Sequence, residues 1–297
     1  MTKLAQQIAT LREISDRYDL ILCDIWGVLH NGVTSFPEAS RSLASFRQRG
    51  GAVILLTNAP RPSGTIGRQL LKLGALHDAF DAIVTSGDVT VQLIAERIHD
   101  PVLHIGPARD LGLFDAVEEV AGRRPLLVPL EDARYALCTG LRDDFTETPQ
   151  DYEAELCALA ARSMTLVCAN PDIIIHRGDA VVFCAGALAR RYEDLGGSVI
   201  HAGKPFPPIY HRAMTMAEGA RGARIDSRRV LAIGDGMRTD IAGAAAAGFD
   251  TLFITGGIHR AVLHGEALNS PADPDELQRL FREYSLWPIA AMPALRG

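Results

Sequence analysis

The sequence predicts an α/β protein: a doubly wound parallel sheet with a second α/β unit inserted into it. In both terminal parts of the chain, apolar runs that end in polar or small residues alternate with helical stretches, which is typical of a parallel sheet covered on both faces. The middle of the chain repeats this alternation with shorter runs. We therefore predict a core formed by residues 1–87 and 201–297 and an inserted domain over residues 88–200.

The core elements follow from hydrophobic runs and helical periodicity. Its predicted strands are Leu20–Asp24, Ala52–Asn58, Ala82–Ser86, Val230–Asp235 and Thr251–Gly256. Its predicted helices are Pro37–Gln48, Ser63–Leu73, Ile209–Glu218, Asp240–Ala247 and Asp275–Tyr284. Apolar residues at helical spacing also predict a helix within the first 18 residues, and the proline-rich tail is expected to pack loosely.

The inserted domain is predicted in the same way. Its strands are Val102–Gly106, Leu126–Val128, Tyr135–Gly140, Thr165–Ala169 and Ala180–Cys184. Its helices are Leu111–Val120, Asp151–Arg162 and Gly186–Leu195. The exposed edges of this second sheet could pair with another subunit, so a homo-oligomer is possible.

Composition excludes several classes of function. The net charge of −6 argues against a nucleic-acid-binding surface, and no run approaches the roughly 20 apolar residues of a membrane span. Five scattered cysteines without a CxxC pair favour reduced thiols and a cytoplasmic location. Cys23 is interpreted as a small buried hydrophobe. No GxGxxG follows the first strand, which disfavours dinucleotide binding.

Polar residues follow the predicted core strands, and the carboxyl ends of parallel strands are where ligands bind. The candidates are Asp24, the pair Thr57-Asn58, Gly203-Lys204-Pro205 and the segment Gly234–Asp240. Each has a structural alternative: a strand-end turn, an Asx turn, an ordinary turn with a surface lysine, and a helix cap by Asp240. The last segment is the most informative, because Asp235 and Asp240 place two carboxylates across a tight turn, as a hard cation requires.

In this order and spacing, the four segments resemble those of the haloacid dehalogenase-like (HAD) hydrolase superfamily. The insertion between the second and third segments, together with Asn170-Pro171-Asp172 inside it, resembles subclass IIA, which includes 4-nitrophenyl, phosphoglycolate and pyridoxal phosphatases. The resemblance covers essentially the whole chain. It implies a Rossmann-like core, a cap domain, and hydrolysis of a small phosphorylated metabolite.

The resemblance also implies roles for individual residues. Asp24 would attack phosphorus and form an aspartyl phosphate. Mg²⁺ would be held by Asp24, the backbone carbonyl of Trp26 and Asp235, with Asp240 orienting that shell. The phosphoryl oxygens would be bound by a final group of residues: the Thr57 hydroxyl, Lys204, the Asn58 backbone N–H, and the N–H groups of Ile25, Trp26 and Gly27.

Trp26 departs from the family pattern, in which a second aspartate stands at that position. The aspartate protonates the leaving oxygen and then activates water, and indole does neither, so the acid–base step should be weakened by about 10²- to 10⁴-fold. The candidates to replace it are His30 and three residues of the insertion, Asp172, His176 and Arg177. Each is also explained as an ordinary polar loop residue.

Three functions remain open from the sequence. The first is a Mg²⁺-dependent phosphatase that favours acyl or aryl phosphates, whose leaving groups need no proton. The second is a dehalogenase-type hydrolase, since those enzymes carry tyrosine at the position of Trp26, although the acidic segment Gly234–Asp240 argues for metal. The third is a non-catalytic phosphometabolite binder. The sequence does not identify the substrate.

Overall fold

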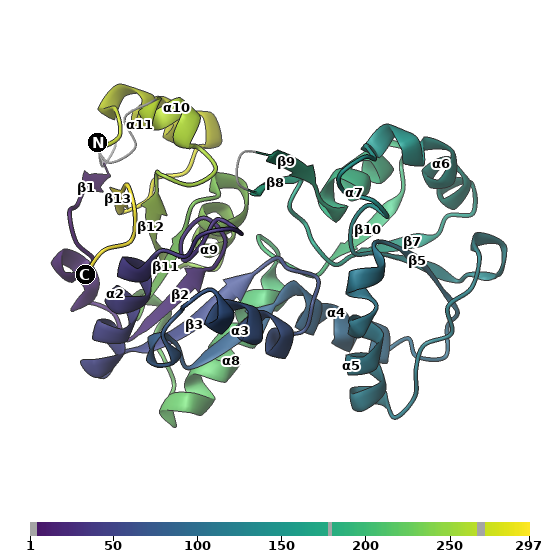
Figure 1. Ribbon diagram of the computed structural model, residues 1–297, viewed down its shortest axis with the longest axis horizontal. Helices are drawn as coiled ribbons and strands as arrows, with labels where there is room; N and C mark the ends of the chain where they lie inside the picture. The colour runs from purple at the N-terminus through teal and green to yellow at the C-terminus, as the bar shows by residue number, and fades with distance from the viewer. Residues whose placement is uncertain (1–4, 178–179, 266–270) are drawn as a thin grey trace. The chain divides into compact units, whose positions relative to one another are not determined.

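The computed structural model describes residues 5–177, 180–265 and 271–297 (Figure 1). The chain divides into two compact units. Unit 1 comprises residues 1–57, 67–84 and 210–297, and unit 2 comprises residues 58–66 and 85–209. We describe each unit by itself.

Unit 1 is built on a seven-stranded sheet with the order β1-β13-β12-β11-β2-β3-β4. Its strands are β1 (Gln6–Gln7), β2 (Leu20–Asp24), β3 (Ala52–Thr57), β4 (Ala82–Thr85), β11 (Val230–Gly234), β12 (Asp250–Ile254) and β13 (Ala290–Met292). Every pairing from β1 across to β3 is parallel. Residues of β2, β3 and β11 are buried throughout, which explains their unbroken apolar runs.

Helices and short helical turns connect these strands in sequence. The α-helices assigned to unit 1 or crossing its boundary are α1 (Arg12–Ser15), α2 (Pro37–Gln48), α3 (Ser63–Lys72), α8 (Pro207–Arg221), α9 (Ala242–Ala246), α10 (Arg260–His264) and α11 (Pro274–Tyr284). Leu277 and Phe281 of α11 pack with Phe253 of β12 and Ile241, which anchors the C-terminal helix to the sheet.

The order of the sheet places a topological switch point between β2 and β11. Chain connections run from β2 outward through β3 to β4 on one side, and from β11 outward through β12 to β13 on the other. Ligands bind outside the carboxyl ends of the strands at such a point. Asp24 ends β2 and Asp235 directly follows β11, so both aspartates lie at this switch point.

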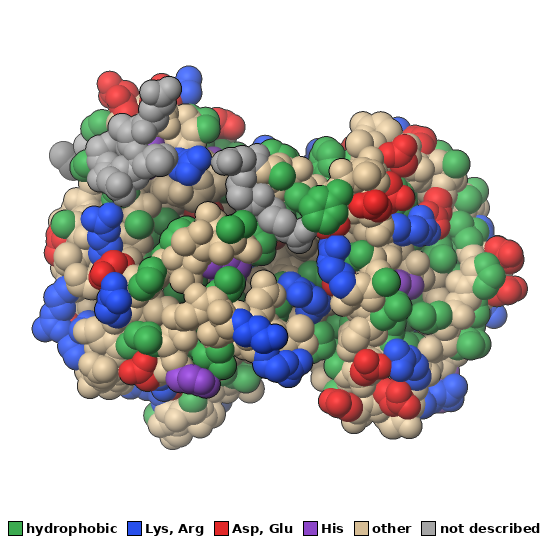
Figure 2. Space-filling model, in the orientation of Figure 1, with side chains coloured by type: hydrophobic (Ala, Val, Ile, Leu, Met, Phe, Trp, Pro, Cys, Tyr) green, Lys and Arg blue, Asp and Glu red, His purple; other side chains and the backbone are tan. Residues whose placement is uncertain are grey.

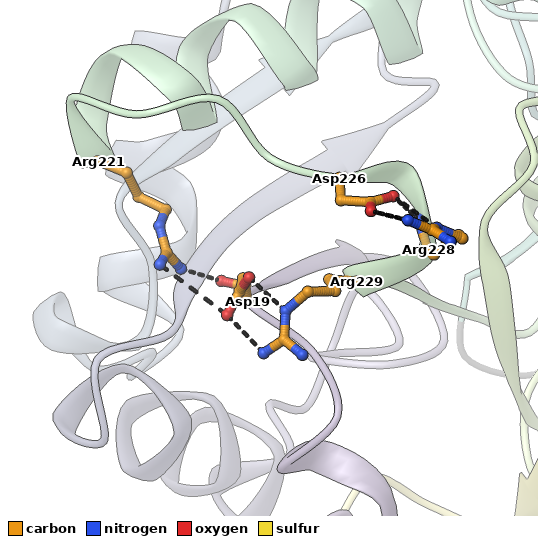
Figure 3. Close-up of polar contacts among 5 residues, drawn as sticks. All are labelled: Asp19, Arg221, Asp226, Arg228 and Arg229. Atoms are coloured by element: carbon orange, nitrogen blue, oxygen red, sulfur yellow. Dashed lines mark hydrogen bonds and ion pairs between the residues drawn. The ribbon is translucent and has the colours of Figure 1, made fainter.

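The opposite ends of β2 and β11 are joined by an ion-pair network (Figure 3). The guanidinium of Arg229 donates two hydrogen bonds, of 2.6 and 2.8 Å, to the carboxylate of Asp19, and Arg221 at the end of α8 donates to the Asp19 carbonyl at 2.7 Å. The Asp19 N–H also donates to the Arg229 carbonyl at 2.8 Å. These contacts hold the two strands that carry Asp24 and Asp235 in register.

Unit 2 contains a four-stranded parallel sheet in the order β10-β7-β6-β5, and an antiparallel hairpin. The sheet strands are β5 (Val102–Ile105), β6 (Tyr135–Cys138), β7 (Thr165–Cys168) and β10 (Ser198–His201), and the hairpin strands are β8 (Ile174–Arg177) and β9 (Ala180–Phe183). Its helices are α4 (Ser86–Ala95), α5 (Gly112–Ala121), α6 (Glu153–Ala161) and α7 (Ala185–Asp194).

Alternating side chains of the second sheet build two apolar layers. Tyr135 and Leu137 of β6 face residues of α4 and α5, whereas Ala136 and Cys138 face residues of α6 and α7. Two helices therefore cover each face, and the prediction of a mixed α/β protein with parallel sheets is confirmed.

Several predicted elements were wrong. The N-terminal segment is helical only over α1, and Gln6–Gln7 instead forms an edge strand beside β13; residues 1–4 lie outside the described part. The tail is not loosely packed, because β13 is buried between β1 and β12. Leu126–Val128 forms only an isolated bridge from Leu127 to Val102. The segment predicted to begin a helix at Asp240 is already a π-helical turn over Met237–Ile241. The sequence reasoning missed α4, β8 and β10.

Within the described residues, no helix is both long and apolar enough to cross a membrane. Acidic and basic side chains are both scattered over the face of each unit that Figure 2 shows. All five cysteines are free thiols, and Cys23 is fully buried in β2, as its position in an apolar run indicated.

Candidate active site

Three aspartates meet at the switch point of unit 1. Asp24, Asp235 and Asp240 are all buried, and one carboxylate oxygen from each lies within 4.8 Å of those of the other two. Three buried like charges repel one another strongly unless a cation or a proton offsets them. Carboxylate oxygens are the donors that hard divalent cations prefer, so this set fits such an ion. The structure thus brings together the three carboxylates that the sequence singled out.

Glycines make the close approach of these carboxylates possible. Gly27 has φ of +85°, and a Cβ at this position would lie 2.1 Å from Oδ2 of Asp235. A Cβ on Gly257 would lie 2.0 Å from the same oxygen, and a Cβ on Gly234 would collide with the Asp240 carboxyl group. The Asp235 carboxylate is therefore enclosed by backbone from two different loops.

Backbone N–H groups fix the orientation of two of the carboxylates. Ile258 N–H donates to Oδ2 of Asp235 at 2.8 Å, and Gly236 N–H donates to Oδ2 of Asp240 at 2.9 Å. Gly257 and Ile258 were missed by the sequence reasoning. The available signal was the Gly256-Gly257 pair that follows the predicted strand Thr251–Gly256 at the same edge.

Trp26 packs within its own loop. The edge of its indole lies against Gly32, where a Cβ would come within 2.5 Å of the ring, and its ring meets that of His30 edge to face at 5.0 Å. The Gly27 N–H donates to the His30 carbonyl at 2.8 Å, which closes the loop. The indole therefore stabilises the loop that follows Asp24, and its N–H is too weak an acid for proton transfer.

His30 does not have the properties of a general acid at neutral pH. It is buried, and burial lowers its pKa to about 4. Its Nδ1 accepts a hydrogen bond of 2.9 Å from the Gly32 N–H, so the ring is held as a neutral imidazole. Like Trp26, His30 is part of the packing of this loop.

Thr57 ends β3 and is buried, at the same edge of the sheet as Asp24, which pairs with Leu56. Ile25 is also buried, and its carbonyl accepts from Leu29 N–H at 2.8 Å, so the Ile25–Gly27 backbone turns sharply after Asp24. This is where the sequence placed a phosphoryl-binding loop.

In unit 2, Asn58 and Lys204 form a buried, hydrogen-bonded cluster. The Asn58 side chain accepts a hydrogen bond from Lys204 N–H at 2.7 Å and donates to the Lys204 carbonyl at 3.1 Å. It also donates to the carboxylate of Asp172 at 2.9 Å. The sequence reasoning assigned only the backbone N–H of Asn58 and missed these side-chain contacts. The side chains of His176 and Arg177, its other candidates, lie outside the described part.

Comparisons with known proteins agree with this geometry. The family model for haloacid dehalogenase-like hydrolases matches residues 21–119, and a related HAD-hydrolase-like model matches residues 201–279. A solved hydrolase of the haloacid dehalogenase-like family from Brucella suis 1330 is 44% identical, with a TM-score of 0.84 over 97% of this chain and 99% of that chain. The chain belongs to the haloacid dehalogenase-like hydrolase family.

Two curated relatives and one further structure refine this assignment. D-glycerol 3-phosphate phosphatase of Mycobacterium tuberculosis is 28% identical over 95% of this chain and 76% of that protein. Ribonucleotide monophosphatase NagD of Escherichia coli K12 is 24% identical over 80% and 88%. The glycerol phosphate phosphatase structure in complex with magnesium has a TM-score of 0.62 and 23% identity over 89% of this chain and 77% of that chain. The relatives are of class IIA type, as the motifs predicted.

Proposed function

We propose that this hydrolase is a phosphatase of a small phosphorylated metabolite, with Asp24 as its nucleophile. The observation that carries the proposal is the buried cluster of Asp24, Asp235 and Asp240 at the switch point of unit 1. The curated relatives, all named as phosphatases or a nucleotidase, support the same reaction class. For the boundaries, we propose that residues 1–87 and 201–297 act as the catalytic core and residues 88–200 as a cap.

The cation that this cluster suits is, in our proposal, Mg²⁺, held by Asp24, the Trp26 carbonyl and Asp235, with Asp240 oriented behind them. When bound, it would neutralise negative charge on the carboxylates and on the phosphoryl group. The Ile258 and Gly236 N–H groups keep Asp235 and Asp240 aimed toward Asp24. Oxygen donors of this kind also suit Ca²⁺, and isothermal titration with each ion distinguishes the two.

The reaction then proceeds in two displacements. A carboxylate oxygen of Asp24 attacks phosphorus, the phosphorus–oxygen bond to the leaving group breaks, and that oxygen departs with the bonding pair. Water next attacks the phosphorus of the aspartyl phosphate, and the bond from phosphorus to the Asp24 oxygen breaks. A proton of the water passes to solvent, inorganic phosphate is released and the Asp24 carboxylate is restored. Following the family pattern, we assign Thr57, Lys204, the Asn58 N–H and the N–H groups of Ile25 and Trp26 to the phosphoryl oxygens. The Gly27 N–H, which the sequence also suggested, is left out because it donates to the His30 carbonyl.

The local surroundings of Asp24 favour leaving groups that need no proton. Trp26 and the neutral His30 occupy the loop beside Asp24, and neither protonates an alkoxide efficiently at neutral pH. We therefore propose acyl or aryl phosphates as the preferred substrates. The five free cysteines support a reducing, cytoplasmic environment as part of the same proposal.

The deciding experiment assays purified protein with Mg²⁺ across a panel of alkyl, aryl and acyl phosphates, beside the variant Asp24→Asn. We expect hydrolysis by the wild type, loss of about 10³-fold or more in Asp24→Asn, and a trapped phosphoenzyme only in the wild type. Asp226→Asn is the control, because Asp226 is an exposed carboxylate paired with nearby Arg228. A wild type that turns over no substrate in the panel contradicts the proposal.

Two other functions predict different outcomes in the same assay. A non-catalytic binder would bind phosphate or form phospho-Asp24 once without multiple turnover. A dehalogenase-type hydrolase would release halide from a haloacid in the presence of EDTA. The carboxylate cluster disfavours the latter, because Asp24 and the two buried carboxylates beside it would repel a carboxylate substrate in the absence of a cation.

A further inference from the structure

A hydrogen-bonded chain runs from the loop after β7 to the backbone of Lys204. Oδ1 of Asp172 accepts from the Asn58 amide at 2.9 Å. The same amide group donates to the Lys204 carbonyl at 3.1 Å, while Oδ1 of Asn58 accepts from Lys204 N–H at 2.7 Å. All three residues belong to unit 2. Asn58 is nevertheless more than 100 positions away from both Asp172 and Lys204 in the sequence.

Asp172 and the Lys204 backbone favour the same orientation of the Asn58 amide. An ionised carboxylate only accepts hydrogen bonds, so it requires the NH₂ end of Asn58 to face it. The oxygen end of Asn58 is then left for Lys204 N–H. Because the bond to Asp172 is charge-assisted, it favours this orientation over the flipped one, which would oppose two oxygen atoms.

The backbone at Gly203 packs closely against the Asn58 amide. A Cβ on Gly203 would lie 2.3 Å from Oδ1 of Asn58 and 2.9 Å from the ring of Pro171. Asn58 is 3% exposed and Lys204 is 4% exposed, so water does not readily replace the missing partner if one bond is lost. In addition, Asp172 N–H donates to Oδ1 of Asn170 at 3.2 Å, which stabilises the loop that presents the carboxylate.

We propose that Asp172 is a positioning residue that acts through the Asn58 side chain to fix the Lys204 main chain, and hence the place from which the Lys204 ammonium binds phosphate. The link to phosphate rests on the function proposed above. The link from Asp172 to the Lys204 main chain does not depend on that function, because it follows from the contacts within unit 2 alone.

The variants Asp172→Ala, Asp172→Asn and Asn58→Asp test this role. Asp172→Ala removes the acceptor, whereas Asp172→Asn keeps one. Asn58→Asp removes the amide donor and places two carboxylates together. Combining it with Asp172→Asn restores a donor–acceptor pair, so we expect the double variant to bind orthophosphate more tightly than Asn58→Asp alone. Asp132→Ala is the control, because Asp132 is an exposed carboxylate of the same unit.

Two readouts separate this inference from the proposed function. Amide hydrogen exchange at Lys204, measured by NMR, should accelerate by about tenfold or more in Asp172→Ala and stay unchanged in Asp132→Ala. The dissociation constant for orthophosphate in the presence of Mg²⁺, and KM for any substrate found, should rise about tenfold in Asp172→Ala and less in Asp172→Asn.

Each outcome decides the inference. If the wild type hydrolyses no phosphate ester but binds orthophosphate with the expected dependence on Asp172, the proposed function fails and the positioning role stands. If Asp172→Ala leaves both the Lys204 exchange rate and the phosphate dissociation constant unchanged, the positioning role is wrong. A wild type that binds no orthophosphate at all also overturns it. A double variant that binds orthophosphate no more tightly than Asn58→Asp would also show that the positioning role is wrong.

Discussion

Gly27 sets how closely the loop after Asp24 approaches Asp235. Its φ of +85° and the 2.1 Å from its absent Cβ to Oδ2 of Asp235 mean that alanine would both strain the backbone and displace the carboxylate. We expect Gly27→Ala to weaken Mg²⁺ binding and to lower kcat/KM by about 10²-fold, because misplacement of a reacting group by about 1 Å has this effect. Isothermal titration with Mg²⁺ and steady-state kinetics measure the two effects.

Gly50→Ala is a matched control for this prediction. Gly50 has φ of +91°, close to that of Gly27, but no atom lies within 4 Å of its absent Cβ. It therefore carries the same backbone strain without the collision, and should lower stability while leaving Mg²⁺ affinity intact. Equal losses of affinity in both variants would show that strain, not contact with Asp235, is responsible.

Trp26 gives the second prediction at this scale. Trp26→Asp would place a carboxyl group two residues after Asp24, where it can protonate a leaving oxygen, so kcat for alkyl phosphates should rise by about tenfold or more relative to aryl phosphates. Loss of the indole contacts with His30 and Gly32 should also lower Tm, which differential scanning calorimetry measures. Trp26→Phe, which keeps an aromatic ring and adds no acid, should leave the alkyl-to-aryl ratio unchanged. An unchanged ratio in Trp26→Asp contradicts the missing-acid argument.

Residue types and spacing predicted the carboxylate cluster but not what surrounds it. Asp235 and Asp240 were identifiable because their separation is local, and Asp24 because it ends an apolar run. The side-chain role of Asn58 could not be predicted from the sequence. Its partners Asp172 and Lys204 lie far away in the sequence, and only the folded chain brings them together.

At the scale of elements, the Asp19 network in Figure 3 joins β2 to β11 at the ends opposite the aspartates. Asp19→Asn should lower the free energy of unfolding by about 1 kcal/mol, a modest figure because the ion pairs are partly exposed and screened by water. Urea unfolding at pH 7 measures it. Asp226→Asn is the control, because the Asp226–Arg228 pair in the same figure joins residues only two positions apart and links no strands.

The contribution of Asp19 should also depend on pH. The hydrogen bond from Arg229 holds the Asp19 pKa below its ordinary value, so the folded state favours the ionised form. This stabilisation is therefore complete above the unfolded-state pKa of about 4 and is lost as the pH falls through the lower, folded-state pKa. The difference between wild type and Asp19→Asn should shrink in urea titrations carried out at pH 3. A difference that grows at low pH would contradict this assignment.

Elements with strong periodicity or long apolar runs were predictable, and those defined by pairing were not. The central strands β2, β3 and β11 follow directly from buried apolar runs. The edge strand β1 has two residues, neither of them apolar, and exists because β13 offers a free edge. β13 itself is a short alanine-rich segment whose burial depends on its neighbours rather than on its own sequence.

At the scale of the whole molecule, three carboxylates are gathered at one edge of the central sheet of unit 1. The core of unit 1 is ordinary and apolar, whereas the switch point holds three buried carboxylates. Sequence alternation predicted the class of fold, but the strand order that brings Asp24 beside Asp235 depends on long-range parallel pairing. This arrangement is less stable without a counter-ion than a neutral site would be, so stability should be linked to metal binding.

This linkage gives the last prediction. A ligand at 100 times its dissociation constant stabilises a protein by about 2.7 kcal/mol, so saturating Mg²⁺ should raise Tm by about 5 °C over the value in EDTA. Asp235→Asn should abolish this increase, because it removes one of the carboxylates that we propose to hold the cation. In EDTA, however, the same variant should melt at or above the wild-type temperature, since it also removes one of three repelling charges. Differential scanning calorimetry of both proteins with and without Mg²⁺ measures all four values. A wild type whose Tm is unchanged by Mg²⁺, or a variant that melts much lower in EDTA, would show that the cluster is stabilised by protein contacts rather than completed by a cation.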